Sequence, residues 1–393
     1  MHEHPQYGTP DLLDRLEGAI AVPVVRSTTF AYRDAESLRA VMAGEVAGEV
    51  YPRYGHVPGR AFEARMAALE GADGAVAFAS GMAALTALFL GLTDGGDAVA
   101  VSRQVYGGLD SMLTHDLPRL GLEVRRFDPF AAGELDEALA DGRVRVVHVE
   151  TPTNPLCRVV DLAAVAAKAH AAGALLTVDA TFQPPPLQRP LAHGADLVMH
   201  SATKILGGHS DTLGGVVSGR HELLERLYGF RRRTGATLAP DTAWLLHRSL
   251  ATLEVRARRA AETAASLAAY LDGVRTAGGP VETVHYPGLP EHPDHAAAGR
   301  QMQTFGFMLS FEARGGLAGA VAIYDRLRRV KRAVSLGGIE SVASLPLHTS
   351  HSYLSPEERA AAGVGDGLIR LSVGLEPAAE LEDDLAQALQ VVD

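Results

Sequence analysis

Short apolar runs alternate with stretches of helical spacing along residues 61–240. The apolar runs predict strands over 75–79, 98–101, 123–127, 144–149, 174–178, 197–199 and 216–217. Stretches of helical spacing before and between them predict helices over 61–70, 82–92 and 162–172. Strands that alternate with helices are typical of βαβ units. The sequence therefore predicts an α/β fold with a mostly parallel sheet between helices.

The pattern changes on both sides of this stretch. Residues 1–60 carry Tyr, Pro, Gly and Arg with weak periodicity, so we expect an N-terminal arm without a core of its own. Residues 241–393 predict a smaller α+β C-terminal domain. Its expected elements are a long helix over 241–270, a strand over 304–311, a helix over 317–329 and a strand over 368–373. Between these parts, 61–240 is expected to form the large domain.

Glycines and polar side chains follow five consecutive predicted strands. In chain order they are Ser80-Gly81-Met82, Tyr106-Gly107-Gly108, the segment 150–155 (Glu-Thr-Pro-Thr-Asn-Pro), Asp179-Ala180-Thr181-Phe182 and the segment 201–204 (Ser-Ala-Thr-Lys). Ligands of a parallel sheet bind beyond the carboxyl ends of its strands. We therefore expect these residues to share one pocket.

Lys204 stands out because the chain uses arginine almost throughout. Of its 36 Lys and Arg residues, only Lys168, Lys204 and Lys331 are lysines. A partly desolvated lysine can lose its proton and act as a nucleophile, which arginine cannot do. The alternatives are a solvated loop lysine, or the S-x-x-K motif of a serine hydrolase formed with Ser201. The hydrolase would also need a K-T-G segment, which the chain lacks.

The other strand ends favour a cofactor. Backbone amides at the helix start after Ser80 bind phosphate well, although an ordinary capped helix would look the same. The buried carboxylate expected at Asp179 needs a cationic partner, such as a protonated pyridine nitrogen. Tyr106, unless it is a core residue, can lay its ring on a planar group. With Lys204, these features describe a pyridoxal phosphate (PLP) site.

Composition excludes several other classes. The net charge of −11 argues against nucleic acid and anionic membranes as partners. A single cysteine, Cys157, indicates a reducing, cytoplasmic environment, and residues 1–10 lack the apolar core of a signal peptide. No metal site is expected, because His348 and His351 lack a third ligand at suitable spacing.

The chain resembles the Cys/Met-metabolism family of PLP-dependent enzymes, typified by cystathionine γ-synthase and γ-lyase. The resemblance runs from about Val22 to Glu376. Besides the strand-end segments, it rests on 51–55 (Tyr-Pro-Arg-Tyr-Gly), 200–211, 335–341 (Ser-Leu-Gly-Gly-Ile-Glu-Ser) and 371–376. It implies the fold type I transferase fold, with a sheet of the seven-stranded type and a smaller C-terminal domain.

The resemblance also implies roles for individual residues. Lys204 is the Schiff-base lysine and, with Tyr51 and Tyr106, catalytic. The implied cofactor-binding set is Lys204, Asp179, Tyr106, Gly81, Met82, Ser201, Thr203, Asn154, Thr181, Tyr51 and Arg53. Arg370, Ser335 and Glu340 are expected to bind an amino-acid substrate. Tyr51 and Arg53 serve a neighbouring subunit in this family, which implies a homodimer or homotetramer with shared active sites.

Several positions on the substrate side depart from the family pattern. They are His56 to Gly59, Leu109, Ala180, Pro186 and the segment 349–352. We expect γ-replacement on an activated homoserine, in which a thiol displaces the acyl group of an O-acylhomoserine. The alternative is γ-elimination, as in cystathionine or methionine γ-lyases. Gly108 lowers the expectation of a methionine γ-lyase, because those enzymes usually carry cysteine there. A non-catalytic PLP-binding regulator is a remote alternative.

Overall fold

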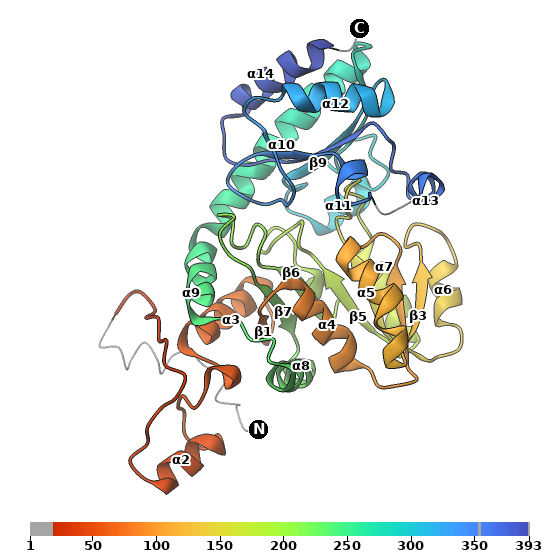
Figure 1. The fold of residues 1–393 in the computed structure, drawn as a ribbon. Helices are drawn as coiled ribbons and strands as arrows, with labels where there is room; N and C mark the ends of the chain where they lie inside the picture. The colour runs from red at the N-terminus through yellow and green to blue at the C-terminus, as the bar shows by residue number, and fades with distance from the viewer. Residues whose placement is uncertain (1–18, 353–354, 392–393) are drawn as a thin grey trace.

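The computed structural model describes residues 19–352 and 355–391, and it contains two sheets (Figure 1). The larger sheet has seven strands in the order β1-β7-β6-β5-β4-β2-β3. Its strands are β1 (Gly74–Phe78), β2 (Ala98–Ser102), β3 (Glu123–Phe127), β4 (Val144–Glu150), β5 (Leu175–Asp179), β6 (Leu197–Ser201) and β7 (Gly215–Gly219). Only β7 runs against its neighbours β1 and β6. The predicted mostly parallel sheet between helices is confirmed.

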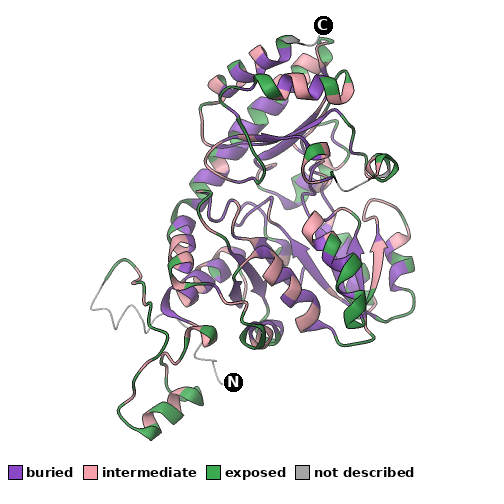
Figure 2. Cartoon of the chain, viewed as in Figure 1, coloured by how far each residue is buried: buried purple, intermediate pink, exposed green. Residues whose placement is uncertain are grey.

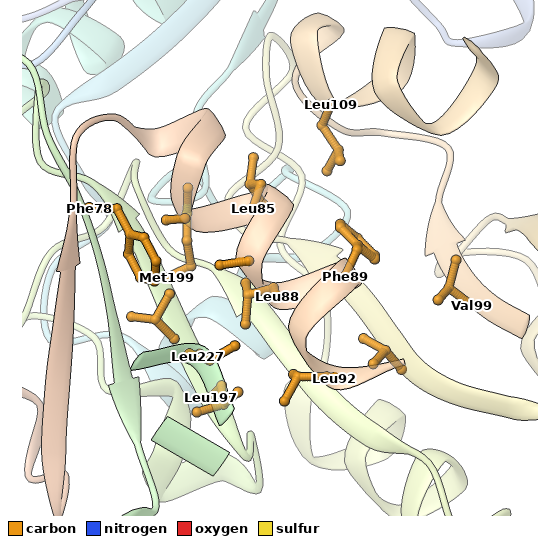
Figure 3. Packing of buried hydrophobic residues seen from close by; sticks show 14 of the residues in the cluster. Phe78, Leu85, Leu88, Phe89, Leu92, Val99, Leu109, Leu197, Met199 and Leu227 are labelled. Carbon is orange, nitrogen blue, oxygen red and sulfur yellow. The ribbon is translucent and has the colours of Figure 1, made fainter. Parts of the chain in front are cut away.

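Helices cover both faces of this sheet. They are α3 (Val57–Glu70), α4 (Gly81–Leu92), α5 (Gly107–His115), α6 (Glu134–Leu139), α7 (Leu162–Ala171), α8 (His221–Thr234) and α9 (Pro240–Ser249). One face packs against α4, α5 and α8, where Leu88 and Phe89 of α4 meet Met199 of β6 and Leu227 of α8 (Figure 3). The other face packs against α3, α6, α7 and α9. Figure 2 shows these strands, apart from the edge strand β3, buried between the two layers. This burial fixes the strand ends in space.

The C-terminal part forms its own sheet of five strands, in the order β10-β11-β12-β9-β8. These are β8 (Val281–His285), β9 (Met308–Ala313), β10 (Lys331–Arg332), β11 (Val342–Ser344) and β12 (Leu368–Ser372). The helices are α10 (Leu253–Thr276), α11 (His295–Gln301), α12 (Gly316–Arg326), α13 (Pro356–Ala361) and α14 (Ala378–Ala388). Leu267, Ile323 and Leu385 bring α10, α12 and α14 into one core with this sheet. An α+β arrangement is therefore present here, as expected.

The long helix expected over 241–270 is interrupted. It divides into α9, a 3₁₀ turn over Leu250–Thr252, and α10. The carbonyl of Ser249 accepts hydrogen bonds from Arg256 Nη2 at 3.0 Å and from Thr252 Oγ1 at 3.3 Å. These side chains compete for a carbonyl that a continuous helix would use, so the expectation of one helix was wrong.

Residues 19–56 form an extended arm that leaves the body of the molecule (Figure 1). Its helix α2 (Ala35–Met42) has no buried residue. Val22 and Arg26 attach the arm to α9: Trp244 Nε1 donates to the Val22 carbonyl at 2.8 Å, and Arg26 pairs with Asp241. Residues 1–18, including the segment judged for a signal peptide, lie outside the described residues. Among those described, no helix is both long and apolar enough to cross a membrane.

Candidate active site

Lys204 lies in a tight turn that follows β6. Its Nζ donates to Ser335 Oγ at 2.6 Å. Burial lowers the pKa of Lys204, and the nearby charge of Arg370 lowers it further. An amine with a lowered pKa is neutral, and so nucleophilic, over a wider pH range. Lys204 Nζ makes this hydrogen bond to Ser335 and not to Ser201, so the serine–lysine pair that the S-x-x-K alternative requires is not formed.

Ser335 reaches Lys204 from the other sheet, through the loop between β10 and β11. Its backbone is left-handed, with φ of 78°. Gly337 makes the close approach possible, because a Cβ there would lie 2.5 Å from the backbone nitrogen of Ile205. The Gly337 N–H donates to Ser372 Oγ at 2.8 Å, which holds this loop on β12. The site therefore lies where the two sheets meet.

Asp179 is the last residue of β5 and is 6% exposed. Its Oδ1 accepts a hydrogen bond from the Thr181 N–H at 2.9 Å. Burial raises the pKa of Asp179, while the hydrogen bonds from Thr181 and the charge of His200 lower it. Such a carboxylate suits a protonated ring nitrogen as its partner.

The ends of β1, β6 and β7 form a narrow cradle around the start of α4. Ser80 caps this helix, with its Oγ accepting from the Ala83 N–H at 3.1 Å. A Cβ at Gly81 would lie 3.0 Å from Ser201 Oγ, and one at Gly215 would lie 2.2 Å from the Ser80 carbonyl oxygen. The first N–H groups of a helix have no partner within the helix, so Gly81 and Met82 can donate to an anion.

Hydroxyl groups complete this cradle. Thr181 Oγ1 accepts from the Ser201 N–H at 2.9 Å, which ties β5 to β6. Thr203 Oγ1 accepts from the Gly214 N–H at 3.1 Å. The structure therefore gathers Gly81, Ser201 and Thr203 at one place, as a phosphate site needs.

Tyr106 precedes α5 and is 51% exposed. A Cβ at Gly108 would lie 2.5 Å from the Tyr106 ring, so glycine there leaves room for this ring position. The Tyr106 N–H donates to Glu150 Oε2 at 2.9 Å. Because Glu150 holds the backbone of Tyr106 and the side chain is accessible, the Tyr106 ring can stack on a planar group.

Arg370 connects β12 to the same place. Its Nη1 donates to Asn154 Oδ1 at 2.8 Å, and its Nη2 donates to the Ser335 carbonyl at 3.0 Å. Burial lowers the pKa of Arg370 to about 10. The Nε atom is buried without a hydrogen-bond partner. A guanidinium with an unused donor at the site is suited to a substrate carboxylate.

A cavity of about 560 Å³ opens beside these groups. Thr203, Ser335 and Glu340 line it, together with Ser210, Asp211 and Lys331. The cavity thus brings together two expected substrate residues, Ser335 and Glu340, and the cofactor candidate Thr203. Its volume suits a small organic ligand.

Tyr51 and Arg53 lie elsewhere, on the arm. They belong to a short 3₁₀ helix over Pro52–Tyr54 and its cap, against α8. Arg53 Nη1 donates to the Arg232 carbonyl at 3.1 Å, and its guanidinium stacks on the rings of Tyr51 and Tyr54. The contacts seen for these two residues are therefore with the arm and α8.

Sequence reasoning placed Glu150 at the end of a strand in the shared pocket but gave it no role. It ends β4, is 6% exposed and faces Asp179 as its register partner. The signal was available, because Glu150 ends a buried apolar run just as Asp179 does. No cluster of three or more His, Cys, Asp or Glu side chains that could hold a metal occurs within 19–352 and 355–391.

These residues fit PLP. Lys204 offers an amine with a lowered pKa, Asp179 a buried carboxylate, and the cradle at Gly81 leaves space that any larger residue would fill. The model of the family described as Cys/Met metabolism PLP-dependent enzyme matches residues 10–390.

Individual relatives are similar over almost the whole chain. The O-succinylhomoserine sulfhydrylase of Pseudomonas aeruginosa is 43% identical, covering 95% of this chain and 91% of the relative. The L-methionine γ-lyase of Pseudomonas putida is 41% identical, covering 95% of this chain and 93% of the relative. The crystal structure of cystathionine γ-synthase from Xanthomonas oryzae pv. oryzae superposes with a TM-score of 0.89 at 38% identity, covering 95% of this chain and 93% of that one.

Proposed function

The chain belongs to the Cys/Met metabolism PLP-dependent enzyme family, and on that premise we propose that it catalyses γ-replacement on an O-acylhomoserine. A thiol forms the new C–S bond at Cγ, and the acyl group leaves as a carboxylate. The observation that favours this reaction is the 43% identity to an O-succinylhomoserine sulfhydrylase. γ-Elimination is the second candidate, because several relatives between 36% and 42% identical are γ-lyases.

Bound PLP would supply a ring that withdraws electrons from the substrate Cα. Lys204 would hold it covalently, and Asp179 would keep the proton on the ring nitrogen. Gly81, Met82, Ser201 and Thr203 would bind its phosphate, and Thr181 and Asn154 would flank it. Tyr106 would cover one face of the ring.

The substrate is positioned by residues of both sheets. Arg370 binds the α-carboxylate as a planar fork, and Ser335 and Glu340 line the adjacent cavity. The Lys204 amine would remove the proton from Cα and later move a proton from Cβ. The hydrogen bond from Lys204 Nζ to Ser335 Oγ supports this role, because Ser335 keeps the amine close to the cavity.

The arm supports assembly with a second copy of the chain. Tyr51 is 41% exposed, and Ile20, Leu38 and Met42 are exposed apolar residues on the same arm. We place Tyr51 and Arg53 in the site of a neighbouring subunit, where Arg53 reaches the phosphate and Tyr51 assists loss of the γ-substituent. The enzyme is then a homodimer or homotetramer. The single cysteine is consistent with a cytoplasmic enzyme.

The decisive test is a paired assay of the purified holoenzyme. O-succinylhomoserine and O-acetylhomoserine are offered with cysteine, with sulfide or alone, and L-cystathionine and L-methionine are offered alone. A thioether or thiol product from an acylhomoserine establishes γ-replacement. Keto acid from cystathionine or methionine, with no replacement product, establishes γ-elimination instead. If no product forms in any of these assays, both candidate reactions are contradicted.

A further inference from the structure

Lys331 of β10 lies on the face of the small sheet that turns away from its helices. The next residue, Arg332, is directed to the helix side, where its Nη1 donates to the Leu327 carbonyl after α12 at 2.8 Å. Successive side chains of a strand point to opposite faces, so Lys331 lies on the other face. Its register partner Val342 lies there too, and both residues line the cavity of about 560 Å³ beside the site.

The strand register places Arg370 on the same face as Lys331. Val342 and Ser344 are two residues apart in β11, so they share a face, and Ser344 is the register partner of Arg370 in β12. Lys331 is therefore two strands and two residues away from Arg370. At usual strand spacings this is a backbone separation of about 12 Å. One small ligand can therefore reach both cationic side chains.

The charge of Lys331 is not matched by a protein group. Within the part of the chain that the structure describes, its ammonium makes no ion pair and no side-chain hydrogen bond. Glu340 and Asp211 line the same cavity, but neither of these described side chains pairs with it. By contrast, Lys168 on the surface pairs with Asp136 at 2.7 Å. The ammonium of Lys331 is thus available to an anionic group of a ligand.

Apolar side chains line the same cavity. Leu213 and Val334 contribute to its wall, and they are 64% and 65% exposed. A ligand that covers them removes apolar surface from water, which favours binding. The cavity therefore combines an aliphatic surface with an ammonium, and this combination suits a carboxylate at the end of a short methylene chain.

We propose that Lys331 is a specificity-determining residue that binds a carboxylate carried beyond the substrate Cγ. This inference rests on the proposed function, in which Arg370 binds the α-carboxylate. The second carboxylate has two sources. The acyl group carries it when the substrate is a succinyl rather than an acetyl ester, and the acceptor thiol carries it when the acceptor is cysteine rather than sulfide.

A ligand without a leaving group tests the carboxylate site independently of the reaction. L-2-Aminosuberate has a second carboxylate at the end of an aliphatic chain, and L-2-aminooctanoate has the same chain without it. Calorimetric titration of the wild-type holoenzyme should show tighter binding of the diacid. Lys331→Met should reduce this preference about tenfold, the effect of one hydrogen bond to a charged group, and Lys331→Arg should retain it. A preference that is absent from the wild type, or unchanged in Lys331→Met, overturns the proposal.

Turnover identifies the source of the carboxylate. O-succinylhomoserine and O-acetylhomoserine are each assayed with cysteine and with sulfide. If Lys331 binds the succinyl carboxylate, Lys331→Met lowers kcat/KM about tenfold for the succinyl ester with either thiol. If Lys331 binds the carboxylate of cysteine, the same variant lowers kcat/KM for cysteine with either ester.

The pair of O-acetylhomoserine and sulfide is the internal control, because neither compound has a second carboxylate. Lys168→Met makes the same substitution on the surface of α7 and should leave all four rates unchanged. An equal fall in all four rates of Lys331→Met, or a fall in none, overturns the proposal. Absence of any replacement product in the wild type would contradict the proposed function instead, and the titration would still decide the role of Lys331.

Discussion

The interior of the large domain and the N-terminal arm hold their charged residues in opposite ways. In the interior, Arg231 Nη1 donates to Glu63 Oε1 at 2.7 Å, and the two side chains are 5% and 11% exposed. On the arm, Arg26 and Asp241 form an ion pair of similar length, but their side chains are 75% and 53% exposed. The two ion pairs are chemically similar, but only the interior pair carries a large desolvation free energy, because only that pair is removed from water.

The same difference divides the expected site residues into two groups. Some are held in place by buried contacts within one subunit, and others lie on the arm, which we propose to contact a neighbouring subunit. Lys204, Asp179 and Arg370 are held by buried strand ends and by hydrogen bonds across the two sheets. Tyr51 and Arg53 lie on an arm whose helix α2 buries nothing. We therefore expect substitutions in the interior to act within a subunit, and substitutions at Tyr51 and Arg53 to act between subunits.

Lys204→Ala should have the largest effect. Without the amine, the cofactor cannot be held covalently, and no group remains to move protons at Cα. We expect turnover to fall by at least about a thousandfold, as when a covalent catalytic group is removed. Absorbance of the lysine-bound cofactor and a product assay measure the two losses.

Lys168→Ala is the matched control for that experiment. Lys168 lies on α7, where it pairs with Asp136 at 2.7 Å on the surface. Its removal should leave turnover at the wild-type level. Wild-type turnover in Lys204→Ala would show that the site has been placed wrongly.

Glu63→Ala should have the second largest effect, on stability. Glu63 Oε1 also accepts from the Ala77 N–H at 2.8 Å, so its loss leaves this strand amide without its acceptor and the buried charge of Arg231 without its counter-charge. Arg231 Nη1 then keeps only the Ala77 carbonyl, at 2.9 Å. Breaking a buried pair in this way lowers the free energy of unfolding by about 3–5 kcal/mol. Denaturant titration of the purified protein measures the change. A loss within error would mean that water reaches this pair.

Arg53→Ala should weaken cofactor retention by about ten- to a hundredfold, the loss of one charged phosphate contact. Equilibrium dialysis against PLP measures the change. Arg33→Ala is the control, because Arg33 is an exposed arm residue paired with its neighbour Asp34.

A mixed enzyme shows whether Arg53 acts between subunits. Arg53→Ala and Lys204→Ala chains are unfolded together and refolded into hybrids. If Arg53 serves the neighbouring site, one site of each hybrid pair has both residues and activity returns. If the mixture is no more active than the two variants measured separately, Arg53 acts within its own subunit.

The hydrophobic pattern located the elements of the large sheet because each is nearly continuous and buried. The expected strand over 144–149 is β4, Val144–Glu150, and the expected helix over 82–92 is α4, Gly81–Leu92. Elsewhere the predicted elements end early where side chains bond to backbone groups, as at the Ser249 carbonyl, where the expected helix over 241–270 is interrupted. The expected strand over 304–311 begins only at Met308, because the Thr304 carbonyl instead accepts from Gln183 Nε2 at 2.6 Å.

Apart from the family resemblance, the sequence points to site residues only where a residue type is rare in its context. Lys204 and Asp179 were singled out because a lysine among arginines and a carboxylate at the end of an apolar strand are unusual. Glu150 is unusual in the same way, but its place beside Asp179 depends on a strand register that no sequence spacing reveals. The hydrogen bond from Arg370 to Asn154 joins residues 216 positions apart, so it depends on the packing of the two sheets.

Arg26→Ala should have the smallest effect and completes the comparison with Glu63→Ala. Both charges of its pair remain hydrated, so water replaces the lost partner and salt already screens the attraction. We expect the unfolding transition to stay where it is in the same denaturant titration. A clear loss of stability would contradict the view that this pair is exposed. If that loss also grew with protein concentration, the arm, in the assembled enzyme, would be buried against a second subunit.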